Sequence, residues 1–241
     1  MDFPSNSVPQ GWTPATVAAE NARFMTRVYG WMAAGLCLTG LVASSLGQNE
    51  ELALAVVQNR PLFWGLVIAQ FGAVLALSGL IQRMSAMVAG LVFFAYAALT
   101  GVTLSTIFLV YSSSSIVEVF GLTAFSFAGL SAFGLVTKRD LGPVGSFCTM
   151  GLFGLVGFSL LSLFFPSMRG AGSNFVMSMV GLLVFSGLTA YDTQKIKAMN
   201  IIGNEGTDED RKEAVSGALT LYLDFVNLFL SLLRLLGRSR D

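Results

Sequence analysis

Apolar runs long enough to cross a lipid bilayer fill most of this 241-residue chain. A helix needs about 20 residues to span the ~30 Å of hydrocarbon in a bilayer. Seven runs meet this length, at approximately residues 28–46, 61–82, 84–111, 116–136, 144–165, 173–195 and 214–236. Within hydrocarbon every backbone polar group must be paired inside the protein, and single runs of this length achieve that as helices. The sequence therefore predicts an all-α, polytopic membrane protein with a bundle of seven transmembrane helices.

The polar segments divide the chain into three predicted parts. Residues 1–22 form a polar arm with three prolines, which we expect to be mostly irregular, with a helix that could start at Ala15. Residues 23–237 form the bundle, and residues 238–241 form a short basic tail. The arm has no apolar core ahead of a small-residue cleavage site, so we do not expect a cleaved signal peptide.

Composition excludes several classes of function. Charged residues make up 12% of the chain, about half the share found in soluble domains, and the mean hydropathy is +0.70. The formal net charge is zero, so no nucleic-acid partner is expected. The chain has no His, and Cys37 and Cys148 lie far apart in apolar runs. This argues against a zinc or haem site and favours buried thiols over a disulfide, so we expect no cofactor.

Lys and Arg residues in short loops predict the orientation in the membrane. We call the side of the N-terminus side A; it also holds the loops after the second, fourth and sixth runs. Nine cations belong to side A: Arg23, Arg27, Arg83, Lys138, Arg139, Lys195, Lys197, Arg211 and Lys212. The opposite loops hold only Arg60 and Arg169, so side A and the N-terminus are expected in the cytoplasm. For the tail two alternatives stay open: seven full crossings place Arg238 opposite side A, whereas a last helix that enters and returns keeps it on side A.

Two carboxylates, Asp192 and Asp224, lie within the last two apolar runs. A carboxylate in hydrocarbon costs roughly 2.5–3.5 kcal/mol even on the lenient insertion scale, so such acids mark functional sites by default. At about 1.5 Å per residue, Asp192 lies roughly 9 Å and Asp224 roughly 15 Å below the side-A ends of their helices. The two helices should be antiparallel, so these carboxyl groups can meet. The alternative is that each aspartate pairs separately with a polar neighbour, such as Tyr191, Thr220 or Asn227.

Carboxylates in contact in a low dielectric do not both ionise easily, so the Asp192–Asp224 pair is expected to share a proton. When the proton leaves, the pair should open or accept a divalent cation. Arg83 lies at the predicted side-A turn between the second and third runs, and its long side chain could reach Asp192. Glu118 is the remaining acid in an apolar run. We expect it to reach the membrane interface, and a place at the mouth of an ion pathway is the alternative.

Two further patterns concern the last loop and the helix contacts. The acidic segment 203–213 lacks the residue order of an EF-hand, which disfavours a calcium loop. Thr207, followed three residues later by Asp210, instead predicts a capping box at the start of the last helix. Small residues allow helices to approach closely in membranes. We therefore expect close helix approaches at Gly121, Gly129, Gly151, Gly154 and Gly157.

The sequence around the two aspartates resembles the transmembrane Bax inhibitor motif family (Bax inhibitor-1-like), in its bacterial branch. The resemblance rests on residues 187–196 (GLTAYDTQKI) and 221–229 (LYLDFVNLF). Three shorter segments are also typical of bacterial members: residues 99–104 (LTGVTL), 137–141 (TKRDL) and 145–147 (GSF). The similarity covers approximately residues 20–237.

This resemblance implies a seven-helix bundle with the last helix central, in the bacterial cytoplasmic membrane. It also implies a pH-dependent calcium leak that is governed by Asp192 and Asp224, with calcium as the permeant or bound ion. Arg83 would latch the closed state. These roles belong to a channel rather than to an enzyme, and we expect no enzymatic activity.

Two other functions stay open. The first is a regulator that binds a membrane protease or quality-control complex without conducting ions, with the polar arm as its contact. The second is a proton-coupled cation exchanger. Intramembrane aspartyl proteolysis would require both aspartates to face a water-filled cavity, and we do not favour it.

Overall fold

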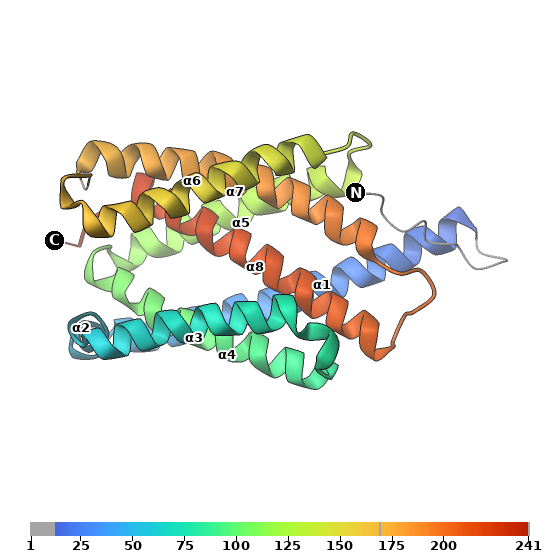
Figure 1. The fold of residues 1–241 in the computed structure, drawn as a ribbon, viewed down its shortest axis with the longest axis horizontal. Coiled ribbons are helices and arrows are strands. Elements are labelled where there is room, and N and C mark those ends of the chain that lie inside the picture. Colours follow the sequence, from blue (N-terminus) through green and yellow to red (C-terminus); the bar gives the residue numbers. More distant parts are fainter. Residues whose placement is uncertain (1–12, 169, 241) are drawn as a thin grey trace. The chain divides into compact units, whose positions relative to one another are not determined.

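The computed structural model describes residues 13–168 and 170–240, and most of this part of the chain is helical (Figure 1). Its α-helices are α1 (Pro14–Gly47), α2 (Glu50–Gln58), α3 (Arg60–Gly79), α4 (Ala86–Leu104), α5 (Ser113–Val136), α6 (Gly142–Phe164), α7 (Ala171–Met199) and α8 (Asp208–Leu236). Short 3-10 helices are η1 (Ile81–Arg83), η2 (Ser105–Leu109) and η3 (Pro166–Met168). Extended pairing within the described ranges is confined to an isolated antiparallel bridge between Tyr111 and Ser239.

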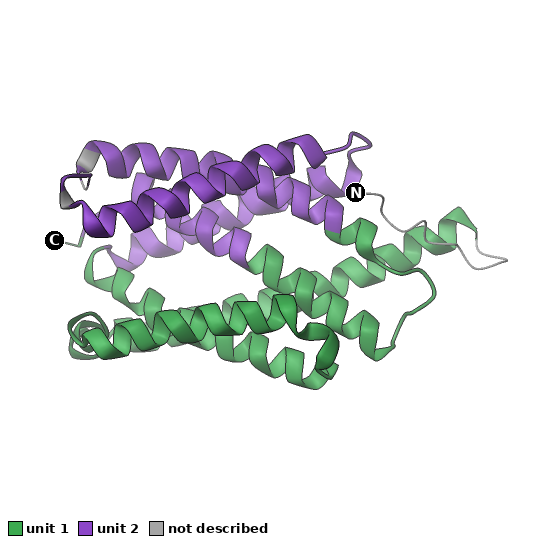
Figure 2. Ribbon diagram, in the orientation of Figure 1, with its two compact units in different colours: residues 1–110, 196–222, 240 green, residues 111–195, 223–239, 241 purple. Residues whose placement is uncertain are grey.

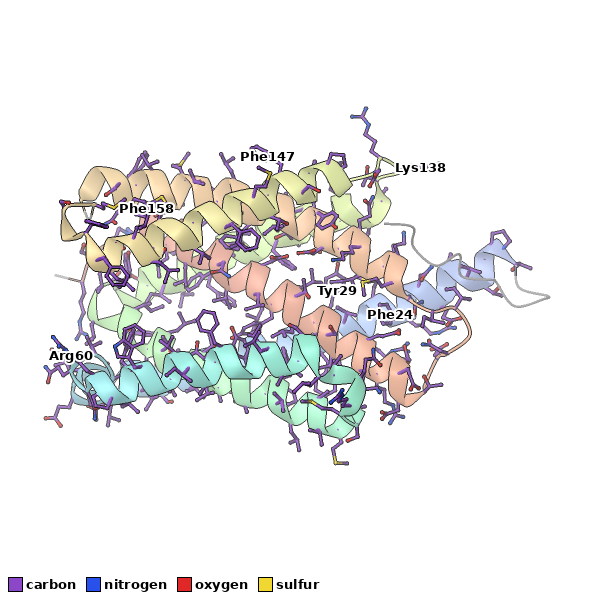
Figure 3. All side chains as sticks on the ribbon, in the orientation of Figure 1. Phe24, Tyr29, Arg60, Lys138, Phe147 and Phe158 are labelled. Carbon is purple, nitrogen blue, oxygen red and sulfur yellow. The ribbon has the colours of Figure 1, made fainter. Side chains whose placement is uncertain are left out.

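Seven of the described helices are long and apolar enough to span a bilayer. They are α1, α3, α4 with η2, α5, α6, α7 and α8, and each overlaps one of the predicted apolar runs. The prediction of an all-α, polytopic membrane protein is therefore confirmed. The last helix, α8, is the most buried of the seven, as expected for a central helix. On the outside, Phe147 points away from α6, where lipid would meet it (Figure 3).

The structure adds one helix that the sequence did not predict. Helix α2 has nine residues, too few to cross a bilayer. Asn49 caps it by accepting hydrogen bonds from the backbone N–H groups of Glu51 and Leu52. Glu50 and Glu51 lie in its first turn, where negative charge suits the helix dipole. The polar stretch that separates the first two apolar runs thus forms the start of a short helix.

Local sequence explains where the long helices begin. Helix α1 starts at Pro14, close to the expected position, and the hydroxyl of Thr13 accepts the N–H of Thr16. Residues 1–12 of the predicted arm lie outside the described residues. At α3, Asn59 is the cap, and Pro61 occupies the first turn, where its missing N–H leaves no unpaired donor.

Helix α8 begins with half of the predicted capping box. The hydroxyl of Thr207 accepts the N–H of Asp210 at 3.2 Å. The Asp210 carboxylate does not return a bond to Thr207 but accepts the N–H of Gly206 at 2.9 Å. Gly206 has a φ of 85°, a backbone conformation that favours glycine. The prediction is right about the helix start and wrong about the reciprocal bond.

The described residues form two compact units (Figure 2). The first unit falls within residues 1–110, 196–222 and 240. The second unit falls within residues 111–195, 223–239 and 241. Helix α8 contributes its first half to the first unit and its second half to the second unit.

Aromatic packing between α1, α4 and α8 forms the core of the first unit. The rings of Phe93 and Tyr96 meet the ring of Tyr222 edge to face, with centroids 5.9 and 5.7 Å away. Gly35 of α1 gives the Phe93 ring room, because a Cβ at this position would collide with it. Edge-to-face pairs of this kind favour one fixed arrangement of the rings.

Small residues bring α5, α6 and α7 together in the second unit. A Cβ on Gly134 of α5 would collide with the backbone of α7, and a Cβ on Gly145 of α6 would collide with the ring of Tyr191. Among the five predicted close approaches, Gly151 does meet a neighbour, Val184 of α7. The prediction is wrong for Gly121, Gly129, Gly154 and Gly157, where a Cβ would meet no described atom of a neighbouring element within 4 Å. These helices are apolar around most of their surface, so the sequence does not reveal which face packs.

The C-terminal tail lies beside the start of α5 in the second unit. The carbonyl of Arg238 accepts the N–H of Ser112 at 3.1 Å, and the N–H of Arg238 donates to the Ser115 hydroxyl at 2.9 Å. Residues 137–141, after α5, lie at the opposite end of that helix. Because α8 is one continuous helix of 29 residues, it does not enter and return. This geometry favours the alternative with seven full crossings, and the side of the membrane on which the tail lies stays a prediction.

Candidate functional site

The candidate site is the pair of acidic side chains that α7 and α8 bring together in the second unit. The carboxyl groups of Asp192 and Asp224 lie within hydrogen-bonding reach of each other. An ionised carboxylate only accepts hydrogen bonds, so a bond between two carboxyl groups requires a proton on one of them. Such an arrangement suits a carboxyl–carboxylate pair that shares one proton, and the shared proton stays a prediction.

The two members of this pair differ in their access to solvent. The Asp224 side chain is only 4% exposed, whereas Asp192 is half-buried. Oδ2 of Asp224 is buried and has no hydrogen-bond partner among the described residues. A buried acceptor without a donor typically costs about 1–3 kcal/mol. This oxygen is consequently a place where a proton donor or a cation would be stabilised.

One cation acts on the pair electrostatically, and one thiol lies within electrostatic range of it. Lys195, three residues after Asp192 on α7, supplies the positive charge. Its ammonium lies 5.8 Å from the centroid of the Tyr191 ring. Cys148 of α6 is buried and lies within electrostatic range of both aspartates. The sequence predicts Cys148 only as a buried thiol, because nothing in it places α6 beside this pair.

Polar side chains fix α7 against α5 and α6 near the first aspartate. The hydroxyl of Thr193, which is fully buried, lies 2.8 Å from the hydroxyl of Ser131. The side chain of Gln194 accepts the N–H of Leu141 at 3.0 Å and donates to the carbonyl of Arg139 at 2.9 Å. These supporting roles are not evident from the sequence, although Thr193 and Gln194 are part of the polar motif that follows Asp192. Together they hold α7 at a defined height.

The polar neighbours that could have paired separately with the aspartates make other contacts. The Asn227 side chain donates to the Leu223 carbonyl at 2.8 Å, and the Thr220 hydroxyl donates to the Ser216 carbonyl at 3.2 Å. The ring of Tyr191 packs against Gly145. Over the described residues, the geometry favours the paired arrangement of the aspartates over the separate one.

The other two predicted site residues, Arg83 and Glu118, lie outside α7 and α8. Arg83 ends η1, is exposed, and belongs to the first unit. Its role as a latch stays a prediction. Glu118 forms an ion pair with Arg238 of the tail, and both side chains are largely exposed. This agrees with the expected position of Glu118 at a membrane interface, and its place in an ion pathway stays a prediction.

Comparisons with known proteins identify the family. The family described as "Inhibitor of apoptosis-promoting Bax1" matches residues 21–241. Inner membrane protein YbhL of Escherichia coli is 44% identical over 218 residues, which cover 90% of this chain and 92% of YbhL. An uncharacterized protein of Borreliella burgdorferi is 42% identical over 219 residues, or 91% of this chain and 93% of that protein. The chain, a polytopic membrane protein whose last two spans carry paired aspartates, therefore belongs to the Bax inhibitor motif family.

Proposed function

We propose that the protein is a pH-sensitive calcium leak channel of the bacterial cytoplasmic membrane, and that the Asp192–Asp224 pair is its gate. The observation that carries the proposal is the contact of two carboxyl groups within apolar helices. Ionisable groups at such positions are costly and generally serve ion or proton pathways. The location is supported by YbhL, an inner membrane protein. The density of Lys and Arg on side A supports a cytoplasmic N-terminus.

At low pH the shared proton links α7 to α8. One carboxyl group donates to the other, and this bond keeps the second half of α8 packed in its unit. Arg83 would latch this closed state further. In this condition the pair carries a single negative charge, with Lys195 as the neighbouring cation.

At higher pH the shared proton leaves and the two carboxylates repel each other. Two unit charges about 4 Å apart interact by about 4 kcal/mol at an effective dielectric constant near 20. This energy is large enough to favour a looser arrangement of α7 and α8. A divalent cation that enters between the carboxylates removes the repulsion, and the unpartnered Oδ2 of Asp224 is available as a ligand.

Calcium suits this site as a passing ion rather than as a resident one. It prefers about six to eight oxygen ligands, and two carboxylates supply four at most. Among the described residues there is no group of three or more His, Cys, Asp and Glu side chains that could hold a metal ion. The remaining ligands would be water or backbone oxygens. Conduction requires binding that is weak enough for the ion to leave.

The test is calcium flux into proteoliposomes between pH 5 and 8, for the wild type and for Asp192→Asn, Asp224→Asn and the double variant. In each single variant the amide can donate to the remaining carboxylate at every pH, so we expect low flux without pH dependence. Glu51→Gln, at an exposed acid of α2, is the matched control and should behave as the wild type. If calcium flux through the double variant kept the pH dependence of the wild type, the Asp192–Asp224 pair would not be the gate.

Two outcomes of the same measurement would indicate the other functions. Well-folded wild type without flux would point to a non-conducting regulator of a membrane protease or quality-control complex, and deletion of residues 1–22 should then impair that role. Saturable exchange of protons for calcium, rather than passive leak, would indicate a proton-coupled exchanger.

A further inference from the structure

The second half of α8 carries its polar residues on one side of the helix. Among residues 225–236, which belong to the second unit, only Asn227, Ser231 and Arg234 are not apolar. At 3.6 residues per turn these positions lie about 60°, 20° and 80° from Asp224 around the helix axis, all in the same direction. The polar side chains of this segment therefore share the side of α8 that carries the second aspartate.

The Ser231 hydroxyl faces α7, as the Asp224 carboxyl does. A Cβ on Gly181 of α7 would lie 2.7 Å from Oγ of Ser231, and the Ser231 side chain is buried. Gly181 precedes Asp192 by about three helical turns, so both residues lie on the same side of α7. The contact between the two aspartates is thus continued, toward the end of α8, by the contact of Ser231 with Gly181.

The neutral polar side chains of this stretch present oxygen atoms as acceptors. The Ser231 hydroxyl donates its single proton to the Asn227 carbonyl, and the Asn227 amide donates to the Leu223 carbonyl, each at 2.8 Å. Because these protons are directed into the helix backbone, Oγ of Ser231 and Oδ1 of Asn227 remain as acceptors. Oδ2 of Asp224, which is buried and has no hydrogen-bond partner among the described residues, is a third acceptor. Acceptor oxygens stabilise cations rather than anions.

The Asn227 amide is costly at its depth. It is half-buried within a candidate membrane span, about 14 Å from the end of α8. A polar side chain inside a span generally faces the interior of the bundle or a water-filled cavity, because contact with lipid is unfavourable. Leu would pack there without this cost, as it does at most neighbouring positions of α8. The amide is therefore better explained by contact with water or an ion than by packing.

We propose that Asn227 and Ser231 line the part of the ion route between the aspartate pair and the end of α8, and that their oxygens are successive weak cation sites. This rests on the proposed function, because it needs an ion that passes the pair. The two residues follow Asp224 by about 5 and 10 Å along the helix axis, so a cation can move from one to the next. Neutral oxygens hold calcium less tightly than carboxylates do, which suits conduction. Arg234, the next polar residue, is exposed near the helix end and limits the route there.

The first test measures calcium flux into proteoliposomes between pH 5 and 8 for Asn227→Leu and Ser231→Ala. Asn227→Leu keeps the size of the side chain and removes its oxygen. It should lower flux at pH 8 about tenfold, which corresponds to one lost contact of about 1.4 kcal/mol, and Ser231→Ala should lower it about threefold. The midpoint of the pH profile should stay at the wild-type value, because both aspartates are intact. Asn227→Asp retains an acceptor oxygen and should keep most of the flux.

Ser159→Ala is the matched control for the flux test. Ser159 is an exposed residue of α6, and its hydroxyl donates to the Leu155 carbonyl four residues earlier, as the Ser231 hydroxyl does to Asn227. The control should have wild-type flux. Wild-type flux in Asn227→Leu would overturn the proposal. A shifted midpoint in Asn227→Leu with undiminished flux at pH 8 would also overturn it, because Asn227 would then belong to the gate and not to the route.

The second test detects water along the route and does not depend on flux. In a background with Cys37→Ala and Cys148→Ala, a single cysteine replaces either Asn227 or Ser231. A charged, water-soluble thiol reagent modifies a cysteine only where water reaches the sulfur. At pH 8 both Asn227→Cys and Ser231→Cys should react at least about tenfold faster than cysteines at control positions.

Two control positions distinguish the route from the protein core and from the lipid-facing surface. Leu233→Cys lies about 200° from Ser231 around α8, and Leu233 is buried. Met150→Cys lies about 60° from Phe147 around α6, and Met150 is exposed on the surface that lipid would meet. Both controls should react slowly, because neither side chain meets water. Equal rates at all four positions would overturn the proposed route.

The two tests separate failure of the route from failure of the channel. Wild type without flux, together with fast modification of only Asn227→Cys and Ser231→Cys, would refute the calcium leak and leave the water-lined route standing. A wild type that conducts calcium, with unchanged flux in Asn227→Leu and Ser231→Ala and slow modification of both cysteines, would overturn the route and leave the channel standing.

Discussion

Arg27 of α1 and Asp210 of α8 form an ion pair of 2.8 Å in the first unit, and the Asp210 side chain is only 1% exposed. The same guanidinium group reaches Glu205, in the loop between α7 and α8, at 3.2 Å. The Glu205 carboxylate also accepts hydrogen bonds from two nitrogens of the Arg23 guanidinium, one on each of its oxygens, so this contact is bidentate. Two arginines of α1 thus hold the loop that precedes the helix with the second aspartate.

We predict that Asp210→Ala destabilises the protein by about 1–3 kcal/mol, because it removes a buried acceptor from two donors. These donors are the guanidinium of Arg27 and the N–H of Gly206. Thermal unfolding in detergent measures the change. Glu209→Ala is the matched control, since Glu209 is the exposed acid beside it and its contact with Lys212 is 3.9 Å long. The control should cost less than about 1 kcal/mol, and an equal cost for both variants would contradict the assigned role of Asp210.

The loop before α8 should loosen in acid. The Arg23 guanidinium beside Glu205 lowers the pKa of that carboxyl below its ordinary value of 4.5. Since the folded pKa is the lower one, the ion pairs stabilise the loop above about pH 4.5, and this contribution is lost as the pH falls through the lowered pKa. Hydrogen exchange of residues 200–207, corrected for intrinsic rates, should show protection at pH 7 that is lost progressively as the pH falls below 4.5. In Glu205→Gln the protection should be weak at every pH, and a wild type that is no better protected than Glu205→Gln at pH 7 would argue against the ion pairs.

Two glycines of α5 should respond in opposite ways to the same substitution. Gly134→Ala places a methyl group against the Ala190 carbonyl, which is backbone and cannot rotate away. We expect a loss of about 1–3 kcal/mol from the overpacked contact. Gly129→Ala meets no described atom within 4 Å and should stabilise α5 by up to about 1 kcal/mol, as Ala is the better helix former. Thermal unfolding in one detergent measures the stability of both variants relative to the wild type. Equal melting temperatures of the two variants would refute the α5–α7 contact.

The tail and the loop between α5 and α6 should react with thiol reagents from opposite sides of the membrane. In a background with Cys37→Ala and Cys148→Ala, Ser239→Cys reports on the tail and Lys138→Cys on the loop. Both positions are exposed, and Lys138 points away from the ribbon (Figure 3). A membrane-impermeant reagent added to intact cells should label Ser239→Cys and spare Lys138→Cys, because side A is proposed to face the cytoplasm. Labelling of both from the same side would contradict seven full crossings.

Much of the fold follows from the sequence because burial in lipid depends on length and hydropathy alone. Each predicted apolar run became a spanning helix, and the caps at Thr207 and Asn59 are readable from single residues and their spacing. The contact of Asp192 with Asp224 could be estimated from their depths, because a helix rises by a constant amount per residue. Helix α2 was missed because nine residues with two leading glutamates look like any polar loop.

What the sequence by itself determined is therefore which residues form the candidate membrane spans and in what order, and it gives an expected depth for the two aspartates. Only the tertiary structure decided direction: which glycine faces a neighbour, where the tail pairs, and how Ser231 meets Gly181. The physical reason is that these helices are apolar on nearly every side, so hydropathy does not fix their rotation. Rotation is set by the fit of side chains against neighbouring helices and by the few hydrogen bonds between them, and both arise only once the helices pack.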